Sequence, residues 1–258
     1  MKLLDYSDYL NYHDQIINVS TKPYGHTFIE NFFPDDRAKK LNTEFKFPDD
    51  DLECSDVTFQ RTKKALNDYQ KLPNEIQNLI NYLNSSQFIE ILEKKFGIKG
   101  LVPDPNLFGG GMHESRRGGY LKIHSDFIYI RKKNIKRRLN LLIYLNEDWD
   151  LNWGGELELW DQKMQNSFLK VPPIINHAVI FRTDTESNHG FPDPLRCPLD
   201  KSRKSIAVYY YTVDNSLFKR TKYFYARWKR RPGIDEPKFG DNRSLFERIK
   251  NNFSFRFR

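Results

Sequence analysis

Cysteine is scarce in this sequence, and long apolar segments are absent. Its 258 residues include two cysteines, Cys54 and Cys197, with no pairing pattern. No apolar run approaches the roughly 20 residues that span a bilayer. The first six residues contain an early acid and lack the apolar segment of a secretory signal. We therefore expect a reduced, cytoplasmic location and no membrane partner.

The sequence also lacks an internal repeat and the polar bias of a disordered chain. Hydrophobic residues make up 38% and aromatic residues 15%, with 20 phenylalanines and 14 tyrosines, which favours strands. The length fits one domain over residues 1–258. Its expected parts are an N-terminal strand and helical part over about 1–100, a core over about 100–213, and a basic aromatic extension over about 214–258.

Apolar periodicity predicts helices early in the chain and strands later. The expected early elements are a polar leader or short helix over 1–20, a strand over 24–33, a helix over 35–45, a loop over 46–61, and helices from Pro73 and over 86–96. These helices are expected to pack outside a sheet. The expected later strands are 138–145, 154–161, 174–181 and 204–212. Short strands separated by turns are typical of a β-sandwich or jelly roll.

Positive charge is concentrated near the C-terminus. The net charge is +8 and the pI is about 9.2. From Phe218 to Arg258, basic residues are interleaved with aromatic ones. Two interpretations are open. The extension packs on the domain through its aromatic side chains, or it binds nucleic acid through basic and aromatic contacts.

A glycine-rich stretch leads into a candidate metal-binding pair. Gly109–Gly111 and Gly118–Gly119 precede an apolar alternation that ends in His124 and Asp126. Residues two apart on a strand point to the same face, so these two side chains project together. With His189 later in the chain, they make the two-histidine, one-carboxylate set of non-haem Fe(II) oxygenases, which leaves metal positions open. A His-x-Asp pair without function is the alternative.

The other four of the six histidines are assigned no metal. His13 lies in the polar leader, and His26 and His177 lie within apolar strands, where packing or a hydrogen bond explains them. His113 follows three glycines, which are kept where the backbone bends tightly or approaches another group closely. We expect His113 to contact substrate or cosubstrate at the mouth of the site. A loop histidine bonded to backbone is the alternative.

Six motifs occur in order between residues 100 and 213. They are Phe-Gly-Gly-Gly-Met-His-Glu-Ser (108–115), Gly-Gly-Tyr-Leu-Lys-Ile-His-Ser-Asp-Phe (118–127), Arg-Leu-Asn-Leu-Leu-Ile-Tyr-Leu-Asn-Glu-Asp-Trp (138–149), Gly-Gly-Glu-Leu-Glu-Leu-Trp (154–160), Asn-His-Gly-Phe-Pro (188–192) and Arg-Lys-Ser-Ile-Ala-Val-Tyr-Tyr-Tyr-Thr (203–212). In these motifs the chain resembles the 2-oxoglutarate- and Fe(II)-dependent dioxygenases, in particular the prolyl-4-hydroxylase-like group.

The resemblance implies a mainly β fold with flanking helices around a double-stranded β-helix, or jelly-roll, core. It implies that His124, Asp126 and His189 bind Fe(II), that 2-oxoglutarate and O2 are consumed, and that ascorbate is a further candidate cofactor. The implied reaction couples oxidative decarboxylation of 2-oxoglutarate to hydroxylation of a substrate C–H bond. Relatives that halogenate carry a small residue in place of the carboxylate, so Asp126 favours hydroxylation.

The resemblance also implies a binding site for the far carboxylate of 2-oxoglutarate. The family uses a basic residue after the distal histidine, which corresponds here to Arg203, with Ser205 on the same strand face. Arginine suits this role because its planar fork pairs bidentately with a carboxylate. Arg196 and Lys201, in a proline-rich loop, are competitors. Tyr144 matches a family tyrosine that bonds the cosubstrate, with a core tyrosine as the alternative.

The remaining candidates surround these groups. Arg138 and Asn140 are expected on the face of Tyr144. Asn140 is assigned to the cosubstrate. The residues assigned to the substrate or to the surroundings of the metal are His113, Phe127, Arg138 and Trp160.

The sequence does not identify the substrate. A prolyl or other residue in a protein, a free amino acid and another small molecule all fit, because one fold serves many substrates. The loops 127–137 and 190–202 are expected to select among them. Basic residues in the first loop indicate either an anionic group on the substrate or a solvated run of charge.

Two other classes of function remain as alternatives. A jelly-roll binding module of the cupin or lectin type holds a metal without redox chemistry, and it has no need for the Arg203 and Ser205 pair. A nucleic-acid demethylase of the alkylation-repair type shares the metal ligands and would explain the basic extension. The quoted motifs fit that type less well, so nucleic acid is not the expected partner.

Overall fold

The computed structural model describes residues 9–47, 55–57, 59–104, 106–130, 133–214 and 225–236. The helices are α1 (Leu10–Ile16), α2 (Asp35–Glu44), α3 (Asn74–Leu83) and α4 (Ser86–Phe96). The strands are β1 (His26–Ile29), β2 (Ser55–Val57), β3 (Gln60–Leu66), β4 (Leu101–Pro103), β5 (Gly111–Ser125), β6 (Tyr129–Ile130), β7 (Ile135–Tyr144), β8 (Leu157–Trp160), β9 (Ser167–Val171), β10 (Ala178–Arg182), β11 (Asn188–Phe191), β12 (Arg203–Val213) and β13 (Arg227–Trp228). The predicted mainly β fold with flanking helices and a jelly-roll core is confirmed.

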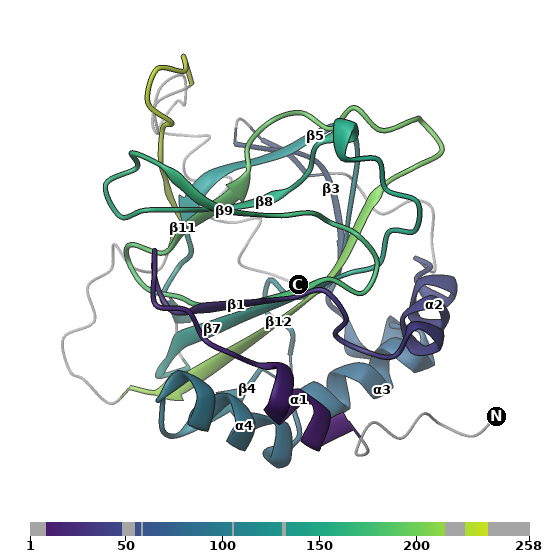
Figure 1. Cartoon of the computed structure of the whole chain (residues 1–258), viewed down its shortest axis with the longest axis vertical. Coiled ribbons are helices and arrows are strands. Elements are labelled where there is room, and N and C mark those ends of the chain that lie inside the picture. The colour runs from purple at the N-terminus through teal and green to yellow at the C-terminus, as the bar shows by residue number, and fades with distance from the viewer. Residues whose placement is uncertain are drawn as a thin grey trace.

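The strands form two layers that share β5. The order is β1-β10-β7-β12-β5-β11-β8-β9, and the neighbours are antiparallel. The first part of β5 pairs with β12, and its last part pairs with β11. Figure 1 shows β8, β9 and β11 in one layer and β1, β7 and β12 in the other, with the helices outside the second layer. The space between the layers is the barrel interior.

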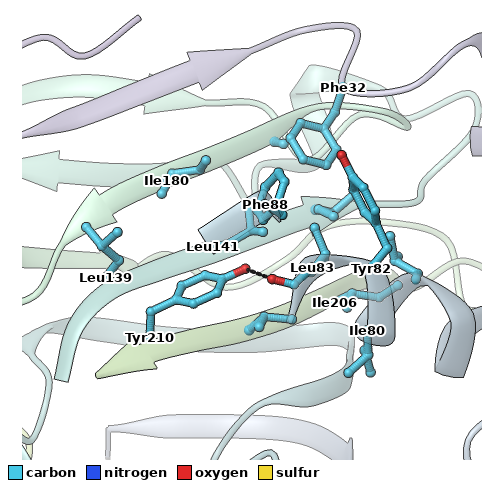
Figure 2. Close-up of a cluster of buried hydrophobic side chains, with 14 of the residues drawn as sticks. Phe32, Ile80, Tyr82, Leu83, Phe88, Leu139, Leu141, Ile180, Ile206 and Tyr210 are labelled. Carbon is cyan, nitrogen blue, oxygen red and sulfur yellow. Dashed lines mark hydrogen bonds between the residues drawn. The ribbon is translucent and has the colours of Figure 1, made fainter. Parts of the chain in front are cut away.

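The helices cover the outer face of β7 and β12. Leu139 and Leu141 of β7 and Ile206 of β12 are fully buried in a cluster with α3 and α4. Figure 2 shows these side chains and the hydrogen bond in which the Tyr210 hydroxyl donates to the Leu83 carbonyl oxygen, 2.8 Å away. Side chains alternate across a strand, so the intervening residues of β7 point into the barrel interior.

Most of the early elements lie where periodicity predicts them. The helices expected over 35–45, from Pro73 and over 86–96 correspond to α2, α3 and α4, and the strand expected over 24–33 contains β1. The loop expected over 46–61 is wrong in part, because β2 and the start of β3 lie inside it. Residues 60–66 carry no apolar alternation, and pairing with β2 and β5 makes them a strand.

The leader contains a short helix whose histidine is buried. His13 of α1 contacts the Tyr82 hydroxyl and the Phe32 carbonyl oxygen through its two ring nitrogens. Burial lowers the pKa of His13 to about 4, so the ring is neutral at physiological pH. The polar leader is thus attached to the helical layer by the buried His13.

The glycine run allows three strands to approach one another. A Cβ at Gly111 would lie 2.2 Å from the Leu66 carbonyl oxygen of β3, and one at Gly110 would lie 2.7 Å from the Ala207 carbonyl oxygen of β12. The expectation of a close backbone approach at this run is confirmed.

Gly111→Ala is expected to destabilise the fold more than Gly118→Ala. Both glycines have positive φ, +87° and +80°, but a Cβ at Gly118 meets nothing within 4 Å. Left-handed backbone costs a residue with a side chain about 1–2 kcal/mol, which is the loss expected for Gly118→Ala. Urea unfolding would measure both losses. Equal losses would contradict the steric role of Gly111.

The described part of the C-terminal extension packs against β5. In β13, Arg227 pairs with Ser125 and Trp228 pairs with His124. The Trp228 ring stacks on Phe59 with centroids 4.9 Å apart. Residues 225–236 therefore follow the first interpretation of the extension, in which it packs on the domain through its aromatic side chains. The rest of the predicted extension lies outside the described residues. In the described chain, no helix is long and apolar enough to cross a membrane.

Candidate metal and cosubstrate site

The two layers bring His124, Asp126 and His189 together. His124 of β5 pairs directly with His189 of β11, and Asp126 follows the end of β5. One ligand atom from each residue lies within 4.8 Å of the others. The His124 Nε2 atom is 3.3 Å from Asp126 Oδ1, and the His189 Nε2 atom is 3.8 Å from Asp126 Oδ2. The arrangement is a compact set of two nitrogens and one carboxylate.

Backbone carbonyl groups orient both imidazoles. The Nδ1 atom of His124 donates to the Lys122 carbonyl oxygen at 2.9 Å, and that of His189 donates to the Ser187 carbonyl oxygen at 2.9 Å. These bonds leave the Nε2 lone pairs directed at the carboxylate, as metal ligation requires. Burial, together with the nearby His124, lowers the pKa of His189 to about 4. His189 is therefore neutral and able to ligate a cation.

Asp126 is held as a carboxylate by a buried arginine. Arg137 Nη1 donates to Asp126 Oδ2 at 3.0 Å. Burial alone would raise the pKa of Asp126, but the charge of Arg137 and the contacts with His189 and His124 hold it well below its ordinary value. The Arg137 guanidinium also lies over the rings of Tyr209 and Phe127, at 3.7 and 3.9 Å from their centroids. It is thus fixed in place by several contacts.

A β-bulge directs Arg137, rather than Arg138, into the site. On β12, Tyr210 pairs with Leu139 and Tyr211 pairs with Arg137, so Arg138 has no partner. An extra residue reverses the alternation of side chains beyond it. The expectation that Arg138 shares the face of Tyr144 is therefore corrected. Arg138 lies near Arg182, and burial together with that charge lowers its pKa.

Arg203 is buried in the barrel interior on the first residue of β12. Its Nε donates to the Gly155 carbonyl oxygen at 2.7 Å, and its Nη2 donates to the Tyr144 hydroxyl at 3.1 Å. The guanidinium lies 4.2 Å from the centroid of Phe191, which is two residues after His189 on β11. Arg196, by contrast, is exposed, and Lys201 is half-buried. Among these three cations, Arg203 is the one enclosed beside the candidate metal ligands.

Three neighbouring strands, β7, β12 and β5, bring paired residues together on the interior face. Ser205 on β12 pairs with Tyr144 on β7 and with His113 on β5. Directly paired residues of antiparallel strands present their side chains on the same face. Asn140 lies four residues before Tyr144 on β7, opposite Tyr209. The structure thus groups these residues with Arg203.

Three buried side-chain atoms in this interior lack a hydrogen-bond partner among the described residues. They are His113 Nε2, Asn140 Oδ1 and Arg137 Nε. Burial, followed by the charge of Lys63, holds the pKa of His113 well below its ordinary value. Buried polar groups are normally hydrogen-bonded, so these atoms indicate that a polar ligand belongs in the interior.

Phe127 and Trp160 have different surroundings. Phe127 lies beside Arg137 and contacts Phe108 edge to face, with centroids 5.6 Å apart. It therefore borders the candidate metal site. Trp160 lies on the opposite face of β8 from Leu159, the partner of His189, and its Nε1 donates to Glu158 at 2.8 Å. The structure thus places Trp160 outside the interior.

Sequence reasoning missed Arg137 and Lys63 as site residues. Arg137 depends on a bulge, which the weak alternation of the segment does not reveal. Lys63 lies on β3, which carries no apolar period. Of the loop 127–137, residues 131 and 132 lie outside the described part, so the prediction of an anion-selecting charge run there stays untested.

A jelly-roll core with two histidines and one carboxylate gathered in its interior defines the class of non-haem metal oxygenases. Comparison with known proteins agrees with this class. Residues 110–211 match the family model described as the 2OG-Fe(II) oxygenase superfamily. The match spans most of the segment that holds the six motifs, and it confirms the resemblance that they predict, that to a 2-oxoglutarate- and Fe(II)-dependent oxygenase. Members of the superfamily use Fe(II), 2-oxoglutarate and O2.

Solved structures show the same fold. A prolyl-4-hydroxylase from Pseudomonas putida is similar with a TM-score of 0.51 and 17% identity, over 72% of this chain and 92% of that one. A prolyl 4-hydroxylase from Phytophthora capsici is similar with a TM-score of 0.50 and 17% identity, over 83% of this chain and 67% of that one.

Proposed function

We propose that His124, Asp126 and His189 hold Fe(II) in a 2-oxoglutarate-dependent hydroxylase. The observation that carries this proposal is the convergence of their ligand atoms within 4.8 Å. The donor set fits a divalent ion, because the Nδ1 bonds of both histidines turn their Nε2 atoms toward Asp126, which is ionised. Fe(II) is the metal that two histidines and one carboxylate with open positions suit.

Arg203 would bind the far carboxylate of 2-oxoglutarate. Within the chain, its Nε donates to the Gly155 carbonyl oxygen and its Nη2 donates to the Tyr144 hydroxyl. A guanidinium enclosed by Phe191 and Tyr144 gains from a charged partner, because an unpaired buried cation is costly. The orphaned Asn140 Oδ1 and the Ser205 hydroxyl line the same interior.

The residues of the chain have defined tasks in this reaction. Bound iron with 2-oxoglutarate and O2 supplies the oxidation that places a hydroxyl group on a substrate C–H bond, with succinate and CO2 as co-products. Arg137 keeps Asp126 ionised and oriented. Phe181, whose ring centroid is 4.6 Å from that of His189, and Phe191 exclude water from the barrel interior.

The substrate is a small molecule or an amino-acid residue, prolyl residues included, and ascorbate would serve as an accessory reductant. The P. putida and P. capsici structures are prolyl hydroxylases by name, which supports an amino-acid C–H bond as the target. A cytoplasmic location remains part of this proposal. Nucleic acid is not part of this proposal, and the Trp228 ring is already stacked on Phe59.

Formation of succinate tests this function. Purified protein with 2-oxoglutarate should release succinate only when Fe(II) and O2 are present, at a slow rate without substrate and faster with one. A metal-binding module without redox chemistry would bind the ion and form no succinate. That result would reject the proposed function.

His113→Ala is expected to uncouple hydroxylation from decarboxylation. The unpartnered Nε2 atom of His113 faces the interior beside Ser205, so the ring would contact substrate or cosubstrate rather than the metal. Iron should still bind, while hydroxylated product falls about tenfold or more relative to succinate, the effect of losing one hydrogen bond to a charged group. Wild-type yields of both products would give His113 a structural role.

A further inference from the structure

Lys63 projects into the barrel interior from β3. It pairs with Ser115 of β5, and Ser115 pairs with Arg203 of β12. Residues paired directly across antiparallel strands present their side chains on one face, so Lys63 and Arg203 share the interior face. Between the Arg61–Tyr120 and Lys63–Ser115 pairs, β3 contains only Thr62, whose φ is 50°, whereas β5 contains residues 116–119. The inward direction of Lys63 therefore follows from its pairing with Ser115.

The surroundings of Lys63 confirm this placement. Burial lowers the pKa of Lys63 to about 8, the negative charge of Asp126 raises it, and the charges of Arg203 and Arg137 lower it further. The groups that act on Lys63 are therefore those of the candidate metal and cosubstrate site. At neutral pH the ammonium is still mainly protonated.

The three cations of the interior do not have equal partners. Arg137 is bonded to Asp126 at 3.0 Å. Arg203 has the far carboxylate of 2-oxoglutarate as its partner under the proposed function. The side-chain ammonium of Lys63 makes no hydrogen bond or ion pair with the described residues, and the neighbouring His113 is neutral. One positive charge in a partly desolvated interior is thus left without an anion.

We propose that Lys63 binds a carboxylate group of the primary substrate, so that this enzyme acts on a carboxylic acid such as a free amino acid. The inference rests on the proposed function and names its substrate class. One surplus cation matches the single charge of a carboxylate better than the higher charge of a phosphate. Lysine suits the role because its flexible stem and three donors follow a mobile ligand.

The test uses protein loaded with Mn(II) and 2-oxoglutarate, in which binding is measured without turnover. Calorimetry with each proteinogenic amino acid and with its amide compares ligands that differ in the carboxylate alone. Dipeptides with a free or amidated C-terminus distinguish a peptide carboxylate from that of a free amino acid. The variants are Lys63→Met, Lys63→Arg and, as a control for loss of an exposed charge, Lys99→Met.

At least one acid should bind wild type and Lys99→Met about tenfold to a hundredfold more tightly than its amide, and Lys63→Met should lose that preference. Lys63→Arg should keep part of it. The affinity of Lys63→Met for 2-oxoglutarate should match that of wild type, which also shows that the variant is folded.

Three results would overturn the inference. They are a loss of 2-oxoglutarate affinity in Lys63→Met, equal binding of acids and amides, and no binding by any carboxylate of the panel. The first would assign Lys63 to the cosubstrate. Failure of wild type to bind 2-oxoglutarate with Mn(II) would instead reject the proposed function itself, and the two failures are therefore distinguishable.

Discussion

His124→Ala is expected to abolish tight Fe(II) binding and 2-oxoglutarate turnover while the fold persists. The variant removes one of three protein ligands, and its loss should exceed the roughly 10–100-fold cost of losing an outer partner of a ligand. Equilibrium dialysis against Fe(II) under anaerobic conditions measures the effect. His177→Ala is a matched control, because His177 is a half-buried histidine bonded to the Pro172 carbonyl oxygen away from the cluster.

Asp126→Asn should also abolish tight Fe(II) binding and turnover, and it should destabilise the fold less than Asp126→Ala. Removing the carboxylate leaves Arg137 buried without its anion, and such a break is destabilising. The asparagine keeps an oxygen that accepts from Arg137. Full iron affinity in either His124→Ala or Asp126→Asn would contradict the assignment of the ligands.

Arg203→Ala is expected to weaken 2-oxoglutarate binding by about tenfold to a hundredfold, the usual cost of losing a charged hydrogen-bond partner. Succinate formation as a function of 2-oxoglutarate concentration measures this effect. Arg203→Lys should restore only part of the affinity, since lysine lacks the planar fork that also contacts Gly155 and Tyr144.

Arg196→Ala supplies the control for Arg203. Arg196 is exposed in the loop before β12, so its removal should leave the 2-oxoglutarate requirement unchanged. Iron affinity should also stay unchanged in Arg203→Ala, because Arg203 contacts none of the three candidate ligands in the described structure. If Arg203→Ala kept the wild-type response to 2-oxoglutarate, the role would move to Arg196 or Lys201.

The strands that carry the candidate site could be predicted from local patterns. The residues of β12 alternate between the helical cluster and the interior, so Arg203 and Ser205 share a face by period alone. His124 and Asp126 follow from the same rule. Family motifs supplied the pairing of these segments, which periodicity does not give.

The remaining site residues depend on irregularities that the sequence pattern does not show. Arg137 enters the interior because Arg138 is bulged, and Lys63 enters through its pairing with Ser115, on a strand without apolar period. A single inserted residue reverses which side chains face the core. The docking of Trp228 beside His124 likewise depends on a tertiary contact.

The central claim is that one iron ion is held by His124, Asp126 and His189 and binds 2-oxoglutarate toward Arg203. Diffraction at the iron absorption edge from anaerobic crystals grown with Fe(II) and 2-oxoglutarate tests it most directly. We predict one anomalous peak about 2.0–2.2 Å from the two Nε2 atoms and an Asp126 oxygen, with the far carboxylate of 2-oxoglutarate against the Arg203 guanidinium. A peak elsewhere, or no iron between these three side chains at full loading, would contradict the claim.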